Sequence, residues 1–114
     1  MINWNRLNGI EQLKEIKDKS SELPVMIFKH STRCPTSSMA LSRLERSWSS
    51  DAEQKLVPYY LDLISYREIS NEVASAFGVQ HESPQVLIIK EGACSYDASH
   101  LMINYNEIME KVAE

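Results

Sequence analysis

The chain has 114 residues, the usual length of one domain and enough to enclose a hydrophobic core. Its formal charge of −4, without a basic cluster, argues against nucleic acid or an anionic membrane as a partner. No stretch approaches the about 20 apolar residues of a membrane span, and no apolar segment of the signal-peptide kind follows the N-terminus. We therefore expect one domain over residues 1–114.

The first half of the chain predicts two strands, each preceded by a helix. A capping-box pattern at Asn8 and Glu11 starts the first helix. The apolar run 25–29 is typical of a central strand that is covered on both faces. The second strand, 56–62, contains Pro58, which places it at an edge of the sheet or puts the proline near the strand start.

The last two helices begin at similar capping-box patterns. One pattern joins Ser65 to Glu68, and the other joins Asn104 to Glu107. Gly78 predicts the end of the helix that starts at the first of them.

Between these two helices the sequence predicts a hairpin. The strand 86–90 is the most apolar of the chain, and a short turn separates it from a partner over 93–97. The full order is α-β-α-β-α-β-β-α, in which helices link parallel strands and the hairpin adds an antiparallel pair. We predict an α/β fold with a four-stranded mixed sheet and helices on both faces.

A cysteine at a helix start is the main chemical signal. Cys34 precedes Pro35, which suits the first helical position because its missing N–H would have no partner there. The positive end of a helix favours a thiolate, which is the form that attacks disulfides. Ser37 occupies the last position of a C-x-x-C motif, so no second cysteine stands there to resolve a mixed disulfide. Nearby residues add basic side chains: Lys29, His30 and Arg33. The alternative is a buried structural cysteine.

The second cysteine, Cys94, lies in the predicted hairpin. It is either a resolving thiol or a buried structural thiol. We favour the structural role, because a disulfide needs Cα atoms within about 7 Å. The strand that contains Cys94 is expected to begin away from the edge of the sheet at which Cys34 lies. The cysteines and the three scattered histidines show no metal-ligand spacing, so we expect no metal.

Three blocks of residues carry a resemblance to a known family. They are the segment Phe28-Lys29-His30-Ser31-Thr32-Arg33-Cys34-Pro35-Thr36-Ser37, the segment His81-Glu82-Ser83-Pro84-Gln85 and the pair Ser99-His100. In this order they resemble the YtxJ-type monothiol bacilliredoxins, redox-active proteins of the bacillithiol system in the thioredoxin-like superfamily. The resemblance spans nearly the whole chain. The chain departs from the family at Tyr96, where a bulkier aromatic is expected, and Cys94 is no family hallmark.

The resemblance implies a thioredoxin-like fold and a monothiol thiol–disulfide oxidoreductase that removes bacillithiol from client proteins. Bacillithiol would be the co-substrate, with no other cofactor, and the protein would be cytoplasmic and monomeric. Cys34 would attack, and Ser37 would stand one turn away, where its hydroxyl is able to donate to the sulfur or is simply a polar residue of the first turn. The Ser83–Pro84 bond would be cis. The implied substrate-binding residues are Thr32, Arg33, Pro35, Thr36, Ser83, Pro84, Ser99 and His100.

Three of these assignments have open alternatives. Arg33 fits the two carboxylates of the bacillithiol malate group, but it is equally a solvated surface residue. His100 is a candidate at the start of the last helix or an ordinary surface histidine. The protein as a whole is alternatively a glutaredoxin-like enzyme for another small thiol, or a thioredoxin-like adaptor that docks an extended peptide while Cys34 stays idle.

Overall fold

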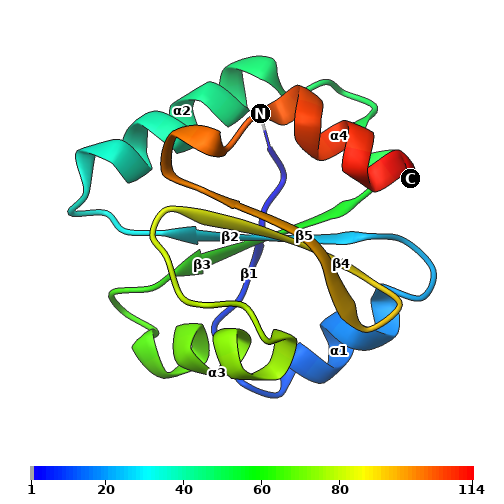
Figure 1. Cartoon of the computed structure of the whole chain (residues 1–114), viewed down its shortest axis with the longest axis horizontal. Helices are drawn as coiled ribbons and strands as arrows, with labels where there is room; N and C mark the ends of the chain where they lie inside the picture. The colour runs from blue at the N-terminus through cyan, green and yellow to red at the C-terminus, as the bar shows by residue number, and fades with distance from the viewer. Residues whose placement is uncertain (1) are drawn as a thin grey trace.

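Five strands form one mixed sheet that lies between two layers of helices (Figure 1). The computed structural model describes residues 2–114. The strands are β1 (Asn5–Arg6), β2 (Val25–His30), β3 (Val57–Asp62), β4 (Gln85–Lys90) and β5 (Ala93–Ser99). The helices are α1 (Gln12–Lys19), α2 (Pro35–Ser47), α3 (Arg67–Phe77) and α4 (Tyr105–Ala113), with 3-10 turns η1 (Ala52–Gln54) and η2 (His100–Met102). Within residues 2–114, no helix has the length and hydrophobicity needed to cross a membrane.

The sheet confirms the predicted architecture but has one strand more than the four expected. Its order is β1-β3-β2-β4-β5, and β4 alone runs opposite to the other strands, antiparallel to both of its neighbours β2 and β5. The extra strand, β1, has two residues and pairs with Tyr59 and Tyr60. So short a strand leaves no periodic pattern in a sequence. Because β1 covers part of β3, Pro58 lies in an inner strand, near its start, and its missing N–H faces away from β2.

β2 is the centre of the sheet, as predicted, and all of its residues are buried. Side chains alternate between the faces of a strand, so β2 contributes to two separate cores. Met26 and Phe28 pack in the core beneath α2 and α4. Val25 and Ile27 pack in the core beneath α1 and α3. The strand therefore ends in the interior, beneath both helical layers.

The first predicted capping box is wrong. Glu11 stands at the N-cap of α1 without a side-chain capping bond. The side-chain oxygen of Gln12 instead accepts hydrogen bonds from the amides of Asn8 and Gly9, at 2.7 and 2.8 Å. A longer amide side chain inside the helix thus satisfies the loop that leads into it.

The second predicted box is also wrong, whereas half of the third is confirmed. Tyr66, not Ser65, is the N-cap of α3, and the Ser65 hydroxyl donates to Asp62 at 3.0 Å. The carboxylate at the end of β3 competes successfully for that hydroxyl. In α4 the Asn104 side chain accepts from the Glu107 amide at 3.0 Å. Gly78 ends α3 in the left-handed region with φ of 64°, as predicted.

Candidate active site

Three loops leave the same edge of the sheet. β2 ends there, the antiparallel β4 begins there, and β5 ends there, with Lys29 paired to Gln85 and Gln85 paired to Ser99. The loops 31–34 and 81–84 and the turn η2 therefore emerge side by side (Figure 1). The fold brings together the three blocks of residues from which a site was predicted.

Cys34 is the N-cap residue of α2 and has an extended backbone, with φ of −109° and ψ of 116°. Pro35 occupies the first helical position, as predicted. The Cys34 amide donates to Ser31 at 3.2 Å, and its carbonyl accepts from Ser38 at 3.1 Å. The side chain makes no capping hydrogen bond and is partly exposed. Cys34 thus lies at the N-terminal end of α2, where the first helix amides have no partner within the helix and the helix dipole is positive.

Ser37 does not hydrogen-bond the sulfur in the structure. It is fully buried, and its Oγ accepts from the Ser31 amide at 3.0 Å and lies 2.7 Å from Nδ1 of His30. The hydroxyl therefore binds the loop that precedes Cys34. Ser37 thus stands where a resolving cysteine would be, and it holds in place the loop that leads to Cys34.

His30 has surroundings that differ from those the sequence suggested. Its ring is buried between Phe28 and Tyr60, with centroids 5.8 and 5.6 Å away. Burial lowers the pKa of His30, although Asp62 and Glu45 act in the opposite direction. The ring is therefore neutral at neutral pH, and it is not the cation beside Cys34 that the sequence suggested.

Lys29 is also not a cation beside Cys34. Strand alternation turns it to the opposite face of β2, where it is fully buried beneath α3. Its ammonium donates to the Ser70 carbonyl at 3.2 Å and lies 3.3 Å from Nδ1 of His81. Burial lowers the pKa of Lys29 to about 8. These contacts tie the loop before β4 to the central strand.

His81 completes this buried polar cluster. Its Nδ1 also lies 3.2 Å from the Ser70 hydroxyl. Burial, then Lys29 and Arg67, lower the pKa of His81, while Glu82 raises it less. A neutral His81 accepts from the ammonium, whereas a protonated ring would repel it.

The buried ammonium predicts a dependence of stability on pH. The pKa of Lys29 is about 8 in the folded protein and about 10.4 in an unfolded chain, so between these values the unfolded state binds one proton more. The free energy of unfolding should therefore rise with pH there, by at most about 1.4 kcal/mol per pH unit. Lys29→Met should remove that rise, measured by urea unfolding between about pH 8 and pH 10. The exposed Lys14→Met is the control, and equal pH slopes in both variants would contradict the assignment.

The segment before β4 is joined to the end of β5. The Ser83–Pro84 peptide bond is cis, and Pro84 is buried. The Pro84 carbonyl accepts from the His100 amide at 3.0 Å. The His100 ring lies 3.6 Å from a Glu82 carboxylate oxygen, and both side chains are largely exposed. The hydroxyl of Ser83 is buried and has no hydrogen-bond partner within residues 2–114.

Of the remaining predicted residues, four are close neighbours of Cys34 in the chain, and Ser99 is the last residue of β5. Thr32, Arg33 and Pro35 are exposed, and Thr36 and Ser99 are half-buried. Beside them α2 packs against η2.

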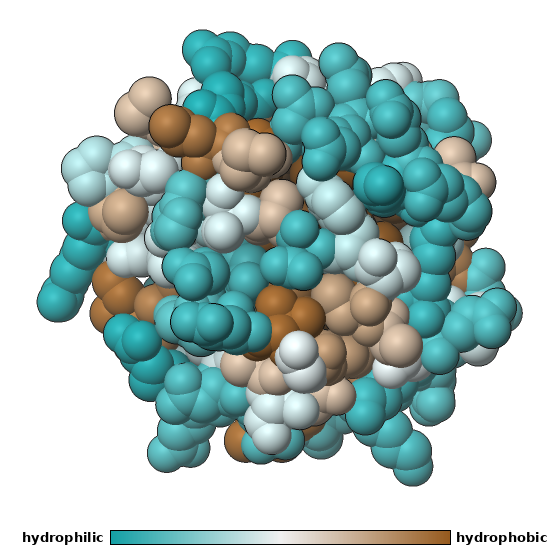
Figure 2. All heavy atoms as spheres, viewed as in Figure 1, coloured by the Kyte–Doolittle hydropathy of each residue, from teal (hydrophilic) through white to brown (hydrophobic). Residues whose placement is uncertain are grey.

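The surface near this contact carries exposed apolar side chains. Met39, Leu101 and Met102 are 58%, 73% and 69% exposed. Hydrophobic atoms reach the surface where α2 and η2 meet (Figure 2). The surface near Cys34 is thus mixed: the loop that precedes Cys34 is polar, and the neighbouring surface of α2 and η2 carries apolar side chains.

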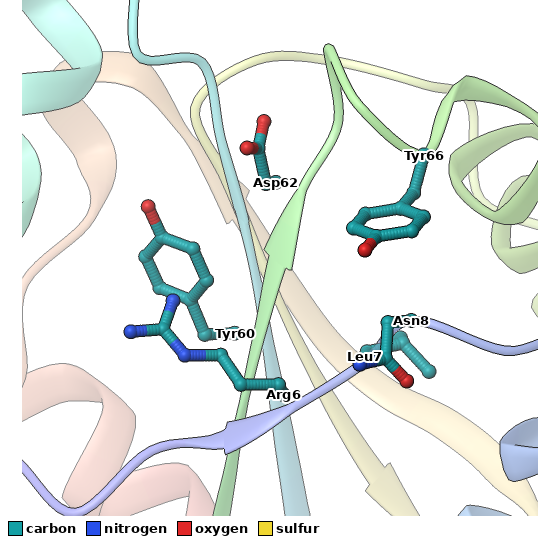
Figure 3. Close-up of a pocket in the computed structure, with 6 residues that line it drawn as sticks. All are labelled: Arg6, Leu7, Asn8, Tyr60, Asp62 and Tyr66. Atoms are coloured by element: carbon teal, nitrogen blue, oxygen red, sulfur yellow. The ribbon is translucent and has the colours of Figure 1, made fainter.

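A small cavity lies where β1 leaves β3. It has a volume of about 200 Å³ and is lined by Arg6, Leu7, Asn8, Tyr60, Asp62 and Tyr66 (Figure 3). The Arg6 guanidinium carbon lies 4.4 Å from the centre of the Tyr60 ring. Tyr60 contacts His30 as well, so this cavity borders the buried end of the site. No pattern in the sequence indicated this cavity, because its residues come from separate segments.

Cys94 lies at the opposite edge of the sheet. It pairs with Ile89 next to the hairpin turn, whereas the active edge is at the other end of β4, roughly 15 Å away by strand geometry. Its half-buried thiol donates to the Tyr96 carbonyl at 3.3 Å, and burial raises its pKa. This placement excludes a direct disulfide with Cys34 in the folded chain and fits the structural role.

Comparison with known proteins agrees with this geometry. The profile of the family described as monothiol bacilliredoxin BrxC matches residues 5–108. A solved structure provisionally described as an oxidoreductase with a thioredoxin fold is 26% identical, with a TM-score of 0.78 over 93% of this chain and 90% of its own.

Thioredoxins are similar in fold at lower identity. The Malassezia sympodialis thioredoxin is 16% identical, with a TM-score of 0.75 over 97% of this chain and 89% of its own. The Fasciola hepatica thioredoxin is 14% identical, with a TM-score of 0.68 over 96% of each chain. The thioredoxin-like fold predicted from the sequence is confirmed.

Proposed function

Because the chain belongs to the monothiol bacilliredoxin BrxC family, we propose that it removes bacillithiol from the mixed disulfides of client proteins. Its family and fold make it a thiol oxidoreductase in general. The observation that carries the finer proposal is Cys34 at the N-cap of α2, partly exposed, with a buried serine where a resolving cysteine would stand.

The reaction proceeds in two exchanges. The Cys34 thiolate attacks the bacillithiol sulfur of the mixed disulfide, that S–S bond breaks, and the client thiolate leaves. Bacillithiol is then bound to Cys34. A second bacillithiol thiolate attacks the sulfur of the bound bacillithiol. The bond to Cys34 breaks, oxidised bacillithiol leaves, and the Cys34 thiolate is restored. We propose that the protein acts as a monomer. Its reaction would take place in the cytoplasm, where free thiols stay reduced.

The side chains around Cys34 provide a binding surface for this substrate. Arg33 is exposed one residue before the sulfur, and its guanidinium is suited to the bacillithiol carboxylates. We assign Thr32, Pro35 and Thr36 to the same side of the bound adduct. Ser83 and Pro84, together with Ser99 and His100, would line the opposite side, because their loops leave the same sheet edge.

Mass spectrometry of the protein mixed with a bacillithiolated client tests the proposal. We expect one bacillithiol adduct on the peptide that contains Cys34, an unmodified Cys94, and no loss of two hydrogens that would indicate an internal disulfide. A glutathionylated client should react more slowly. Faster transfer from glutathione would identify a glutaredoxin-like enzyme. A client that binds without any transfer would identify an adaptor, and both outcomes would contradict the proposal.

A further inference from the structure

The hydrogen bond between His30 and Ser37 lies beneath Cys34 and has no role in the exchanges described above. A serine hydroxyl has one hydrogen to donate and two acceptor positions. The Ser31 amide occupies one acceptor position of Ser37, at 3.0 Å. Nδ1 of His30, at 2.7 Å, is the other partner, either as donor or as acceptor. The imidazole therefore decides where the hydroxyl hydrogen points.

The protonation of the ring limits the arrangements to two. His30 is 4% exposed, and burial lowers its pKa against the opposing effects of Asp62 on β3 and Glu45 on α2. A neutral ring carries its proton on one nitrogen. With the proton on Nε2, Ser37 donates to Nδ1. With the proton on Nδ1, the ring donates to Ser37 and the hydroxyl hydrogen is free.

The Cys34 sulfur belongs to the same helical turn as this free hydrogen, and in the structure the two side chains are not hydrogen-bonded. Cys34 is the N-cap of α2 and Ser37 is the third helical residue, the two positions that approach each other in a capping box. The Cys34 side chain makes no capping bond of its own. A thiolate is a much stronger acceptor than a thiol, because hydrogen bonds to charged groups are the stronger ones.

We propose that His30 is a positioning residue that, through Ser37, supplies or withholds a hydrogen bond to the Cys34 sulfur. With the thiol, Ser37 donates to Nδ1 and the ring is protonated on Nε2. With the thiolate, the ring is protonated on Nδ1 and donates to Ser37, which donates to the sulfur. The ring has one proton in both states, released from Nε2 and regained at Nδ1 through water. The proposal rests on the proposed function only in taking Cys34 as the reacting thiol.

Nitrogen-15 NMR of the full chain observes the two tautomers directly. Across the pH range in which the alkylation rate of Cys34 by iodoacetamide rises, the His30 ring should change from the Nε2–H to the Nδ1–H form. In Ser37→Ala and in Cys34→Ser it should keep one form throughout. A wild-type ring that keeps the same tautomer below and above the alkylation midpoint would overturn the proposal.

The pH midpoint of Cys34 alkylation provides a second readout. Ser37→Ala should raise it by about half to one pH unit, because the thiolate loses a donor. His30→Asn should keep the wild-type midpoint, since its amide nitrogen falls near the place of Nδ1 and donates to Ser37. The exposed Ser38→Ala is the control, and equal midpoints in Ser37→Ala and Ser38→Ala would refute the role. Neither readout uses bacillithiol, so both measurements test this proposal independently of the proposed function.

Discussion

The Cys34→Ser protein is expected to lose the removal of bacillithiol from clients, with a fall in rate of at least about a thousandfold. A serine hydroxyl stays protonated at neutral pH and does not attack a disulfide, whereas a thiolate does. The remaining site would be intact, because serine fits the partly exposed N-cap position and is itself a favoured cap residue. The measurement is the rate at which a bacillithiolated client regains its thiol in the presence of free bacillithiol.

Cys94→Ser is the matched control. Its thiol is bonded to the Tyr96 carbonyl at the far edge of the sheet, so the rate should stay within about twofold of the wild type. A Cys34→Ser protein that still restores client thiols would mean that another group performs the exchange. Equal losses in the two variants would mean that both sulfurs take part, and the monothiol mechanism would be wrong.

Ser37→Cys is expected to change the product of the first exchange. A second thiol would stand one helical turn after Cys34, the spacing at which a neighbouring sulfur displaces a bound thiol. The bacillithiol adduct should fall below about a tenth of its wild-type level, with an internal disulfide in its place. Mass spectrometry distinguishes the two through an added bacillithiol or a loss of two hydrogens.

The same variant should be less stable in its reduced form. The Ser31 amide and the His30 ring lose a buried hydroxyl partner, and a thiol is a weak replacement. We expect a decrease of about 1 to 3 kcal/mol in the free energy of unfolding, measured with urea. Ser38→Cys, on the exposed side of α2, is the control and should form no bridge. If the adduct accumulates on Ser37→Cys as on the wild type, the buried serine is not what makes the protein monothiol.

The order of the elements and the position of Cys34 could be predicted from the sequence, because both are local properties. The apolar run of β2 has the length and composition of a covered strand. Pro35 marks the first helical residue of α2, and that fixes Cys34 at the N-cap. Gly78 marks a helix end for an equally local reason, since it adopts a positive φ.

The environments of Lys29 and His30 could not be predicted in the same way. Both precede Cys34 closely in the sequence, which suggested two cations near the sulfur. In the fold they point to opposite faces of β2 and are buried, one against Ser70 and His81, the other against Ser37. Alternation along a covered strand contained a partial signal, because a strand buried on both faces also buries its last two side chains. The partners of these side chains come from distant segments and needed the tertiary structure.

The pairing of β1 with β3 also bears on resistance to aggregation. Main-chain groups on an open strand are free to pair with another molecule. β1 covers them at Tyr59 and Tyr60, and the amide of Leu7 donates to the Tyr60 carbonyl at 2.9 Å. A protein shortened past Leu7 would therefore present an aromatic, β-prone strand to its neighbours, and self-association would remove it from solution before its thiol met a client.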